Sequence, residues 1–212
     1  MTRKLLLFEN AIMIDLSAEA WEKRYQENRD PWDLGCPAPP LINLLASAQA
    51  PKPGRMAVLG CGSGQDAMLF STAGFDVIGF DFAASAIARA DKIAKARELN
   101  TQFLQRNIFD LEVEFLHSFD YVLEHTCFCA IDIELRSQYV QVVKNLLRPN
   151  GQLIALFFTH SRLDGPPFGV KPQAILDSFS PYFDIILFQA AKDSITGRKG
   201  EEHLAIFQVK ST

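Results

Sequence analysis

Apolar residues follow two alternating patterns along this chain, short continuous runs and stretches with helical spacing. Continuous apolar runs bounded by turn residues are typical of buried strands. We expect strands at 56–59, 75–80, 101–105, 119–123, 152–158, 183–188 and 204–209. Helical spacing predicts helices at 18–28, 41–48, 65–73, 85–99, 133–147 and 172–179. Strands that alternate with helices predict a doubly wound α/β sheet, mostly parallel, whose last two strands pair as an antiparallel hairpin.

Composition narrows the class of protein. The 212 residues are 48% hydrophobic and 22% charged, which is typical of a soluble globular protein. The net charge of −4 gives no basic footprint, so we expect no nucleic-acid partner. No apolar run approaches the roughly 20 residues that cross a bilayer, and the run at 5–8 is too short for a signal peptide. We therefore expect a cytoplasmic protein with no membrane partner.

The cysteines and histidines show no metal-binding pattern. Cysteines stand at 36, 61, 127 and 129, and the segment Cys127-Phe-Cys129 lacks the two-residue gap of a zinc or redox motif. His117 and His203 show no ligand spacing with one another or with acidic residues. We expect four reduced thiols and no metal.

A glycine-rich loop lies between the first strand and the helix that follows it. Gly60, Gly62 and Gly64, with Cys61 between the first two, let a cofactor approach the backbone and the free N–H groups of the helix start. The dinucleotide fingerprint needs a glycine at position 65, where this chain has Gln65. The G-x-G-x-G run instead resembles the motif of class I S-adenosylmethionine-dependent methyltransferases.

Residues near the ends of the next strands complete a candidate cofactor site. Asp81 ends the second strand, next to Phe82, and its carboxylate suits two ribose hydroxyls, in S-adenosylmethionine or NAD alike. Asp66 is placed to meet the ammonium of a methionine moiety or simply to stabilise the helix dipole. We expect three residues after the third strand to surround the adenine: Asn107, Ile108 and Phe109. Phe109 fits the core equally well.

Six segments carry a resemblance to a known family. They are 20–25 (AWEKRY), 31–35 (PWDLG), 60–66 (GCGSGQD), 124–131 (EHTCFCAI), 165–168 (GPPF) and 198–200 (RKG). The first three resemble the thiopurine S-methyltransferase superfamily, and the fourth and fifth resemble its thiol and halide methyltransferase branch. The last segment extends the similarity to almost the whole chain.

The resemblance implies a Rossmann-like, doubly wound, seven-stranded α/β sheet, mostly parallel with a C-terminal antiparallel hairpin, plus an N-terminal helical lid. We expect one class I methyltransferase domain over 1–212, with the lid segment at 1–50 and the Rossmann-like core at 51–212. The resemblance implies S-adenosyl-L-methionine as cofactor, S-adenosyl-L-homocysteine as product and a small-molecule methyl acceptor. We expect a monomer and leave a dimer open.

The resemblance also assigns positions in the cofactor site. It implies that Trp21, Tyr25 and Trp32 line the S-adenosylmethionine site, where a sulfonium is attracted to aromatic faces. It implies that Gly60 and Asp81 hold the methionine backbone and the ribose. An apolar anchor for the first helix is the alternative role for Trp21.

The chain departs from the plant members of this branch near the reaction centre. It has Tyr25 where they have Trp, Glu124-His125 where they have Asp-Tyr, and Asn107-Ile108 where they have Asp-Val. The resemblance implies that His125 lies near the sulfonium and the substrate. The change from Tyr to His at that position leaves the acceptor open.

Methyl transfer to a thiol is helped by a base, because a thiol of pKa about 8.5 is only partly ionised at neutral pH. His125 is the candidate base or else a structural hydrogen-bonding residue, and Glu124 is placed to orient it or to contact the donor. Trp32, Cys129 and Phe168 are candidate walls of the substrate pocket.

These observations predict an S-adenosylmethionine-dependent methyltransferase that acts on a small thiol or another soft nucleophile by direct in-line displacement. Two alternatives stay open. The first is an O-, N- or metalloid methyltransferase on another small molecule. The second is a non-catalytic protein that binds S-adenosylmethionine or a dinucleotide.

Overall fold

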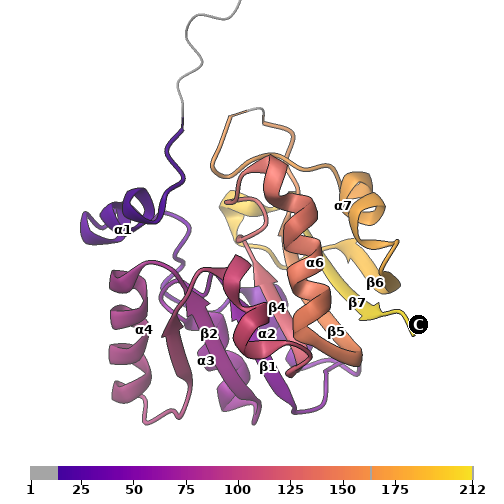
Figure 1. The fold of residues 1–212 in the computed structure, drawn as a ribbon, viewed down its shortest axis with the longest axis horizontal. Coiled ribbons are helices and arrows are strands. Elements are labelled where there is room, and N and C mark those ends of the chain that lie inside the picture. Colours follow the sequence, from indigo (N-terminus) through magenta and orange to yellow (C-terminus); the bar gives the residue numbers. More distant parts are fainter. Residues whose placement is uncertain (1–13, 163, 212) are drawn as a thin grey trace, which may run out of the picture.

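A computed structural model describes residues 14–162 and 164–211, and the predicted short apolar run at 5–8 lies outside these ranges. The described chain forms a seven-stranded sheet of order β3-β2-β1-β4-β5-β7-β6 (Figure 1). The strands are β1 (Arg55–Leu59), β2 (Asp76–Asp81), β3 (Gln102–Gln105), β4 (Phe119–His125), β5 (Leu147–Phe158), β6 (Phe183–Ala190) and β7 (Glu202–Val209). The helices are α1 (Ala18–Gln26), α2 (Pro39–Leu45), α3 (Gln65–Thr72), α4 (Ala84–Ala96), α5 (Glu112–Phe115), α6 (Arg136–Leu146) and α7 (Pro172–Phe179).

The first five strands pair in parallel, whereas β7 pairs antiparallel with both β5 and β6. The predicted Rossmann-like, mostly parallel seven-stranded sheet with a C-terminal antiparallel hairpin is therefore confirmed. The chain builds outward from β1 through β2 to β3, then returns to place β4 on the other side of β1. Ligands of such sheets bind at the carboxyl ends of the strands where the order reverses. In this sheet the reversal lies between β1 and β4.

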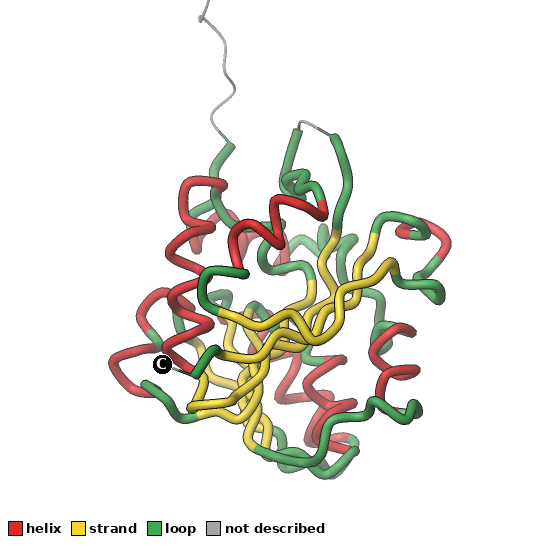
Figure 2. Tube along the Cα trace, turned by 90° about the vertical axis from the view of Figure 1, so that its right-hand side faces the viewer, coloured by secondary structure: helices red, strands yellow, loops and turns green. Residues whose placement is uncertain are grey.

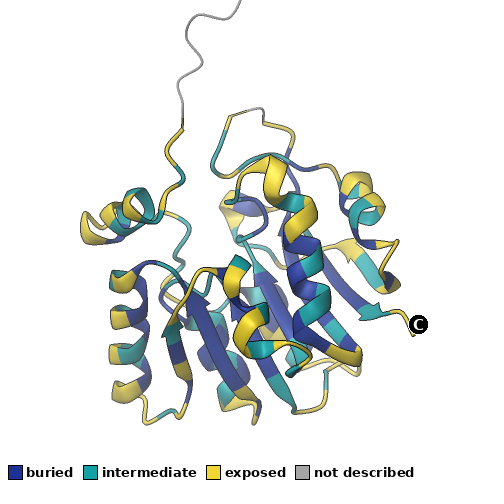
Figure 3. Cartoon of the chain, viewed as in Figure 1, coloured by how far each residue is buried: buried dark blue, intermediate teal, exposed yellow. Residues whose placement is uncertain are grey.

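Helices cover both faces of the sheet (Figure 2). One face packs against α6 and α7 through a phenylalanine-rich cluster that includes Phe128, Phe157 and Phe179. The other face packs against α2, α3 and α4. The strands between them are largely buried (Figure 3). Burial on both faces explains why the strands read as continuous apolar runs.

The structure differs from the predicted elements in a few places. β5 starts at Leu147, five residues before the expected strand at 152–158. Leu147 pairs with Phe119 ahead of a register shift, and Asn150 adopts φ +64°. The expected helix at 133–147 splits into a 3₁₀ turn (η2, Ile133–Leu135) and α6. The short 3₁₀ turn η1 (Ile108–Asp110) and helix α5 have no counterpart among the predicted elements.

The N-terminal segment is fastened to α4 at two points. Ser17 caps α1 by accepting a hydrogen bond from the Ala20 N–H. The Glu22 carboxylate accepts from the backbone N–H of Ser85 (2.9 Å) and from its hydroxyl, and so caps α4 from outside. Arg89 of α4 donates to the Asp30 carboxylate and to the carbonyl of Tyr25 (3.3 Å).

Gly64, the third glycine of the loop after β1, is required by packing. Its φ of +77° lies in the left-handed region, and a Cβ there would stand 2.6 Å from the Phe103 ring of β3. The loop therefore passes against the sheet more closely than any side chain allows. Gly64 serves helix–strand packing, and it lines neither of the two cavities described below.

We expect Gly64→Ala to lower the free energy of unfolding by about 3 kcal/mol, since it combines left-handed strain with overlap. Gly200→Ala is the matched control, because Gly200 has φ +82° but nothing within 4 Å of its Cβ position. Urea denaturation followed by circular dichroism measures both variants. Equal losses in the two variants would show that the Phe103 overlap contributes nothing.

Candidate active site

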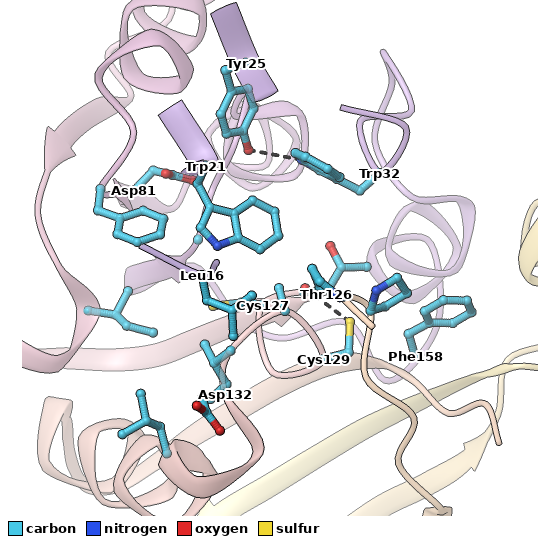
Figure 4. A pocket seen from close by; sticks show the side chains of 18 of the residues that line it. Leu16, Trp21, Tyr25, Trp32, Asp81, Thr126, Cys127, Cys129, Asp132 and Phe158 are labelled. Atoms are coloured by element: carbon cyan, nitrogen blue, oxygen red, sulfur yellow. Dashed lines mark hydrogen bonds between the residues drawn. The ribbon is translucent and has the colours of Figure 1, made fainter. Parts of the chain in front are cut away.

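A cavity of about 490 Å³ opens at the carboxyl ends of the central strands, beneath the N-terminal segment. Figure 4 shows side chains from α1, the segment after it and the loop after β4 around this space. The residues predicted for the cofactor or substrate that line it are Trp21, Tyr25, Trp32, Gly60, Asp81, Phe82, Asn107, Ile108, Phe109 and Cys129. The structure thus brings together most of the predicted cofactor residues from five separate parts of the chain.

Asp81 is fixed at the end of β2 by the backbone around it. Its carboxylate accepts from the N–H of Gly62 (3.0 Å) and of Ala83 (2.9 Å). Burial raises the pKa of Asp81, although these N–H donors act in the opposite direction. Asn107 accepts from the Phe109 N–H (3.2 Å) and so starts η1, which presents Ile108 and Phe109 to the cavity.

Three aromatic side chains of the N-terminal segment form one wall. The Trp32 ring makes edge contacts with Trp21 (centroids 5.1 Å apart) and Tyr25 (5.6 Å), and its indole N–H donates to the Tyr25 hydroxyl (3.1 Å). Burial and the nearby Asp81 charge raise the pKa of Tyr25, so its hydroxyl stays protonated. Figure 4 shows this wall facing the loop after β4.

The rest of the cavity has a mainly apolar lining. It includes Thr126, Cys127, Cys129, Ala130, Ile131, Leu135, Phe158, Pro166 and Pro167, and Asp132 adds a carboxylate next to Ile131. Burial raises the pKa of Cys127 and of Cys129 (the latter to about 12), so neither thiol is a ready nucleophile. Arg198 brings a guanidinium to this lining, and its side chain is only 9% exposed.

Glu124 lies behind the cavity rather than on its surface. It is 1% exposed and accepts from the Tyr139 hydroxyl (2.7 Å) and from the Phe128 N–H (3.0 Å). Burial raises the pKa of Glu124 to about 7, although these donors lower it. Successive side chains of a strand point to opposite faces, so Glu124 faces α6 while His125 faces α3. The structure therefore does not bring Glu124 into contact with His125 or with the cavity.

His125 is held between three charged side chains. Its Nδ1 lies 2.6 Å from Asp66 Oδ2, and its Nε2 lies 2.8 Å from Arg198 Nη1 and 3.8 Å from Glu202 Oε1. Burial and the Arg198 guanidinium lower the pKa of His125, whereas Asp66 and Glu202 raise it. The 2.8 Å contact of Nε2 with a guanidinium N–H, which can only donate, selects the neutral ring. Both ring nitrogens are therefore in use within the protein.

His125 lines a second, small cavity of about 50 Å³ rather than the large one. Cys61, Gly62 and Asp66 line this small cavity with it, and Trp32 and Gly60 border both. Phe168 lines neither, since its ring packs against Gly165. Its N–H donates to the Cys129 carbonyl (2.6 Å), which fixes the loop after β4 from behind. The predicted roles of His125, Glu124 and Phe168 stay predictions.

Arg198 is one of the charged lining residues that sequence reasoning did not single out, along with Arg106 and Asp132. It appeared only within the motif at 198–200, with no role attached. Its position depends on the short turn η3 (Thr196–Arg198) before β7, which brings the C-terminal hairpin back to the N-terminal segment. The charged motif at the start of the last strand was the available signal.

The described residues also bear on three other features, which are a metal site, a membrane-spanning helix and disulfide bonds. Within 14–162 and 164–211, no group of three or more His, Cys, Asp or Glu side chains is arranged to hold a metal ion. In the same ranges no helix is long and apolar enough to cross a membrane. The four cysteines are unpaired.

Comparison with known proteins gives a family match over most of the chain. The model of the family described as thiopurine S-methyltransferase matches residues 16–211. Over 207 residues the chain is 31% identical to a protein of Arabidopsis thaliana named "Probable thiol methyltransferase 2", covering 95% of this chain and 89% of that protein. It is 30% identical to "Thiocyanate methyltransferase 1" of the same plant, covering 87% and 82%.

A solved structure supports the fold. The 1,6-didemethyltoxoflavin-N1-methyltransferase of Burkholderia thailandensis superposes with a TM-score of 0.75, over 96% of this chain and 94% of that one, at 17% identity. Its structure was solved with S-adenosylhomocysteine bound. At this identity the likeness concerns the fold alone.

The raised pKa of Glu124 predicts a pH-dependent stability that Glu124→Gln removes. This pKa is about 7 in the folded protein and about 4.5 in the unfolded chain. As pH rises from 5 to 8 the unfolded chain releases the proton first, so this group lowers wild-type stability by about 3 kcal/mol. The glutamine keeps an acceptor for Phe128 and a polar partner for Tyr139.

Urea denaturation at pH 5 and pH 8 measures this effect. The stability of the glutamine variant relative to wild type is expected to rise between the two pH values. A difference that is the same at both would contradict the raised pKa.

Proposed function

The chain belongs to the thiopurine S-methyltransferase family, and on this premise we propose that it methylates the sulfur of a small thiol with an apolar body. The protein is an S-adenosylmethionine-dependent methyltransferase that acts on a small molecule. The single observation that carries the sulfur acceptor is the far end of the large cavity, where an apolar lining meets the Arg198 guanidinium.

The cofactor half of the cavity fits S-adenosylmethionine. The Asp81 carboxylate would hold the ribose, and Phe82, Asn107 and Ile108 would surround the adenine. Gly60 lets the glycine loop pass close to the loop after β4, since a Cβ there would stand 2.9 Å from Cys127 Sγ. S-adenosylmethionine supplies a methyl group on a sulfonium, and in-line attack by the acceptor sulfur leaves S-adenosylhomocysteine.

The aromatic wall suits the positive charge of the donor. Trp21, Tyr25 and Trp32 present ring faces and edges to the cavity, and a cation over an aromatic face gains about 0.5–2 kcal/mol. The same rings exclude water from the cavity, which strengthens the electrostatic interactions inside it. Protein side chains thus position the reactants and exclude solvent.

The acceptor half favours an anionic sulfur nucleophile. Ile131, Leu135 and Phe158 would pack against the apolar body of the acceptor. The Arg198 guanidinium stabilises a thiolate over a thiol, because a nearby cation lowers the pKa of the thiol. The described residues that line this cavity include two carboxylates, Asp81 and Asp132, but no histidine, so an alcohol would meet no imidazole base there.

We expect purified protein to release S-adenosylhomocysteine with small alkyl and aromatic thiols and to leave phenols and amines unmethylated. The panel includes hydrosulfide, thiocyanate and iodide, which lack an apolar body and should give lower kcat/KM than an aromatic thiol. Asp81→Asn is the control for the cofactor site, and it should weaken S-adenosylhomocysteine binding by calorimetry about tenfold or more.

Turnover of phenols or amines but not of thiols would overturn the sulfur acceptor while leaving the methyltransferase intact. Binding of S-adenosylhomocysteine without turnover of any acceptor on the panel would overturn the thiol proposal as well.

A further inference from the structure

A buried line of side chains joins three parts of the fold beside the active site. Asp66 of α3, His125 of β4 and Arg198 of η3 follow one another at 2.6 Å and 2.8 Å, and Glu202 of β7 lies 3.4 Å beyond Arg198. The Asp66, His125 and Arg198 side chains are 15%, 10% and 9% exposed. Buried polar groups lower the stability of the fold unless each of them has a hydrogen-bond partner.

The direction of these hydrogen bonds follows from the chemistry of arginine. A guanidinium N–H can only donate, so the 2.8 Å contact requires a free lone pair on His125 Nε2. The ring proton then lies on Nδ1 and is donated to Asp66. In this arrangement His125 fixes the guanidinium, and its only lone pair is occupied.

Two members of this line, Asp66 and Arg198, also hold the N-terminal segment. Asp66 Oδ1 accepts from the backbone N–H of Ala38 (2.8 Å), and Arg198 Nη2 donates to the carbonyl of Trp32 (3.0 Å). The stretch from Trp32 to Ala38 is therefore bound at each end by the same line of side chains. Trp32 is part of the aromatic wall over the cofactor half of the cavity.

We infer that His125 is a positioning residue, which holds the Arg198 guanidinium at the acceptor end of the cavity and thereby couples it to the docked N-terminal segment. This inference rests on the proposed function, in which Arg198 attracts the acceptor thiolate. Asp66 orients the ring of His125. One hydrogen-bond network therefore fixes both the stretch from Trp32 to Ala38 and the Arg198 guanidinium, which binds the acceptor.

A general base is the competing role for His125, and the two roles differ in which acceptors they affect. A base matters only for an acceptor that must lose a proton. A positioning residue affects ionised and protonated acceptors alike, because both use the placement of Arg198. When a substitution weakens acceptor binding equally in the ground state and in the transition state, KM rises and kcat stays unchanged.

The test compares His125→Phe with His125→Gln at pH 8 and saturating S-adenosylmethionine. Phenylalanine fills the site without a lone pair, whereas glutamine offers an oxygen to Arg198 but has no basic nitrogen. The acceptors are a nitro-substituted benzenethiol, which is ionised at this pH, and an alkanethiol, which is largely protonated. His117→Asn is the control, since His117 bonds the Leu147 carbonyl away from both cavities.

We expect His125→Phe to raise KM about tenfold for both thiols with kcat nearly kept, as loss of a fixed ion contact does. His125→Gln should stay within about threefold of wild type. Loss of kcat for the alkanethiol alone, in both variants, would overturn the positioning role and establish a base.

A second measurement is independent of turnover. Both tryptophans of the chain, Trp21 and Trp32, lie in the N-terminal segment, so acrylamide quenching of their fluorescence reports how well the segment is docked. With S-adenosylhomocysteine bound, quenching should increase in His125→Phe and change less in His125→Gln. Thermal unfolding and S-adenosylhomocysteine affinity confirm that each variant is folded.

The two proposals fail in different ways. If wild type methylates neither thiol, the proposed acceptor is wrong, and the quenching result alone decides whether His125 couples Arg198 to the segment. Unchanged quenching in His125→Phe, with or without turnover, overturns the coupling.

Discussion

Several carboxylates are buried where the parallel strands end, and each of them needs hydrogen-bond donors around it. This requirement is the constraint on which the site depends. A carboxylate out of water must be surrounded by donors. Asp81 takes the N–H groups of the glycine loop and of the start of α4, and Glu124 takes the Phe128 N–H and the Tyr139 hydroxyl. Asp66 takes the Ala38 N–H and His125. Each acid therefore organises one of the surfaces that bound the cavities.

The two halves of the large cavity follow from this arrangement. Around Asp81 the backbone is open and the aromatic wall stands opposite, which suits a nucleoside with a cationic sulfur. Beyond the Glu124-supported loop the lining becomes mainly apolar, and its charged groups are the Arg198 guanidinium and the Asp132 carboxylate. The protein thus separates recognition of the donor from recognition of the acceptor along one continuous space.

The cofactor half could be predicted from the sequence because its residues directly follow strands that continuous apolar runs predict. The glycine run, Asp81 and the residues after β3 lie where continuous apolar runs end. The acceptor half could not, because it depends on contacts far apart in the chain. The Arg198 contact with Trp32 spans 166 positions. In addition, β4 continues to His125, beyond the expected end at 123, so strand alternation sends Glu124 and His125 to opposite faces. Helix α5 is four residues long, too short for helical spacing to show.

Helix α4 has an unusual dependence on its neighbours. Its N-cap residue, Ala83, has no side-chain acceptor, and the first-turn amides are satisfied instead by Asp81 and by Glu22 of α1. Withdrawal of the N-terminal segment would leave the Ser85 amide without its acceptor and let the first turn of α4 fray. The hydrogen–deuterium exchange rate of the Ser85 amide would therefore report how often the N-terminal segment leaves α4, and with it how often the active site is accessible to its ligands.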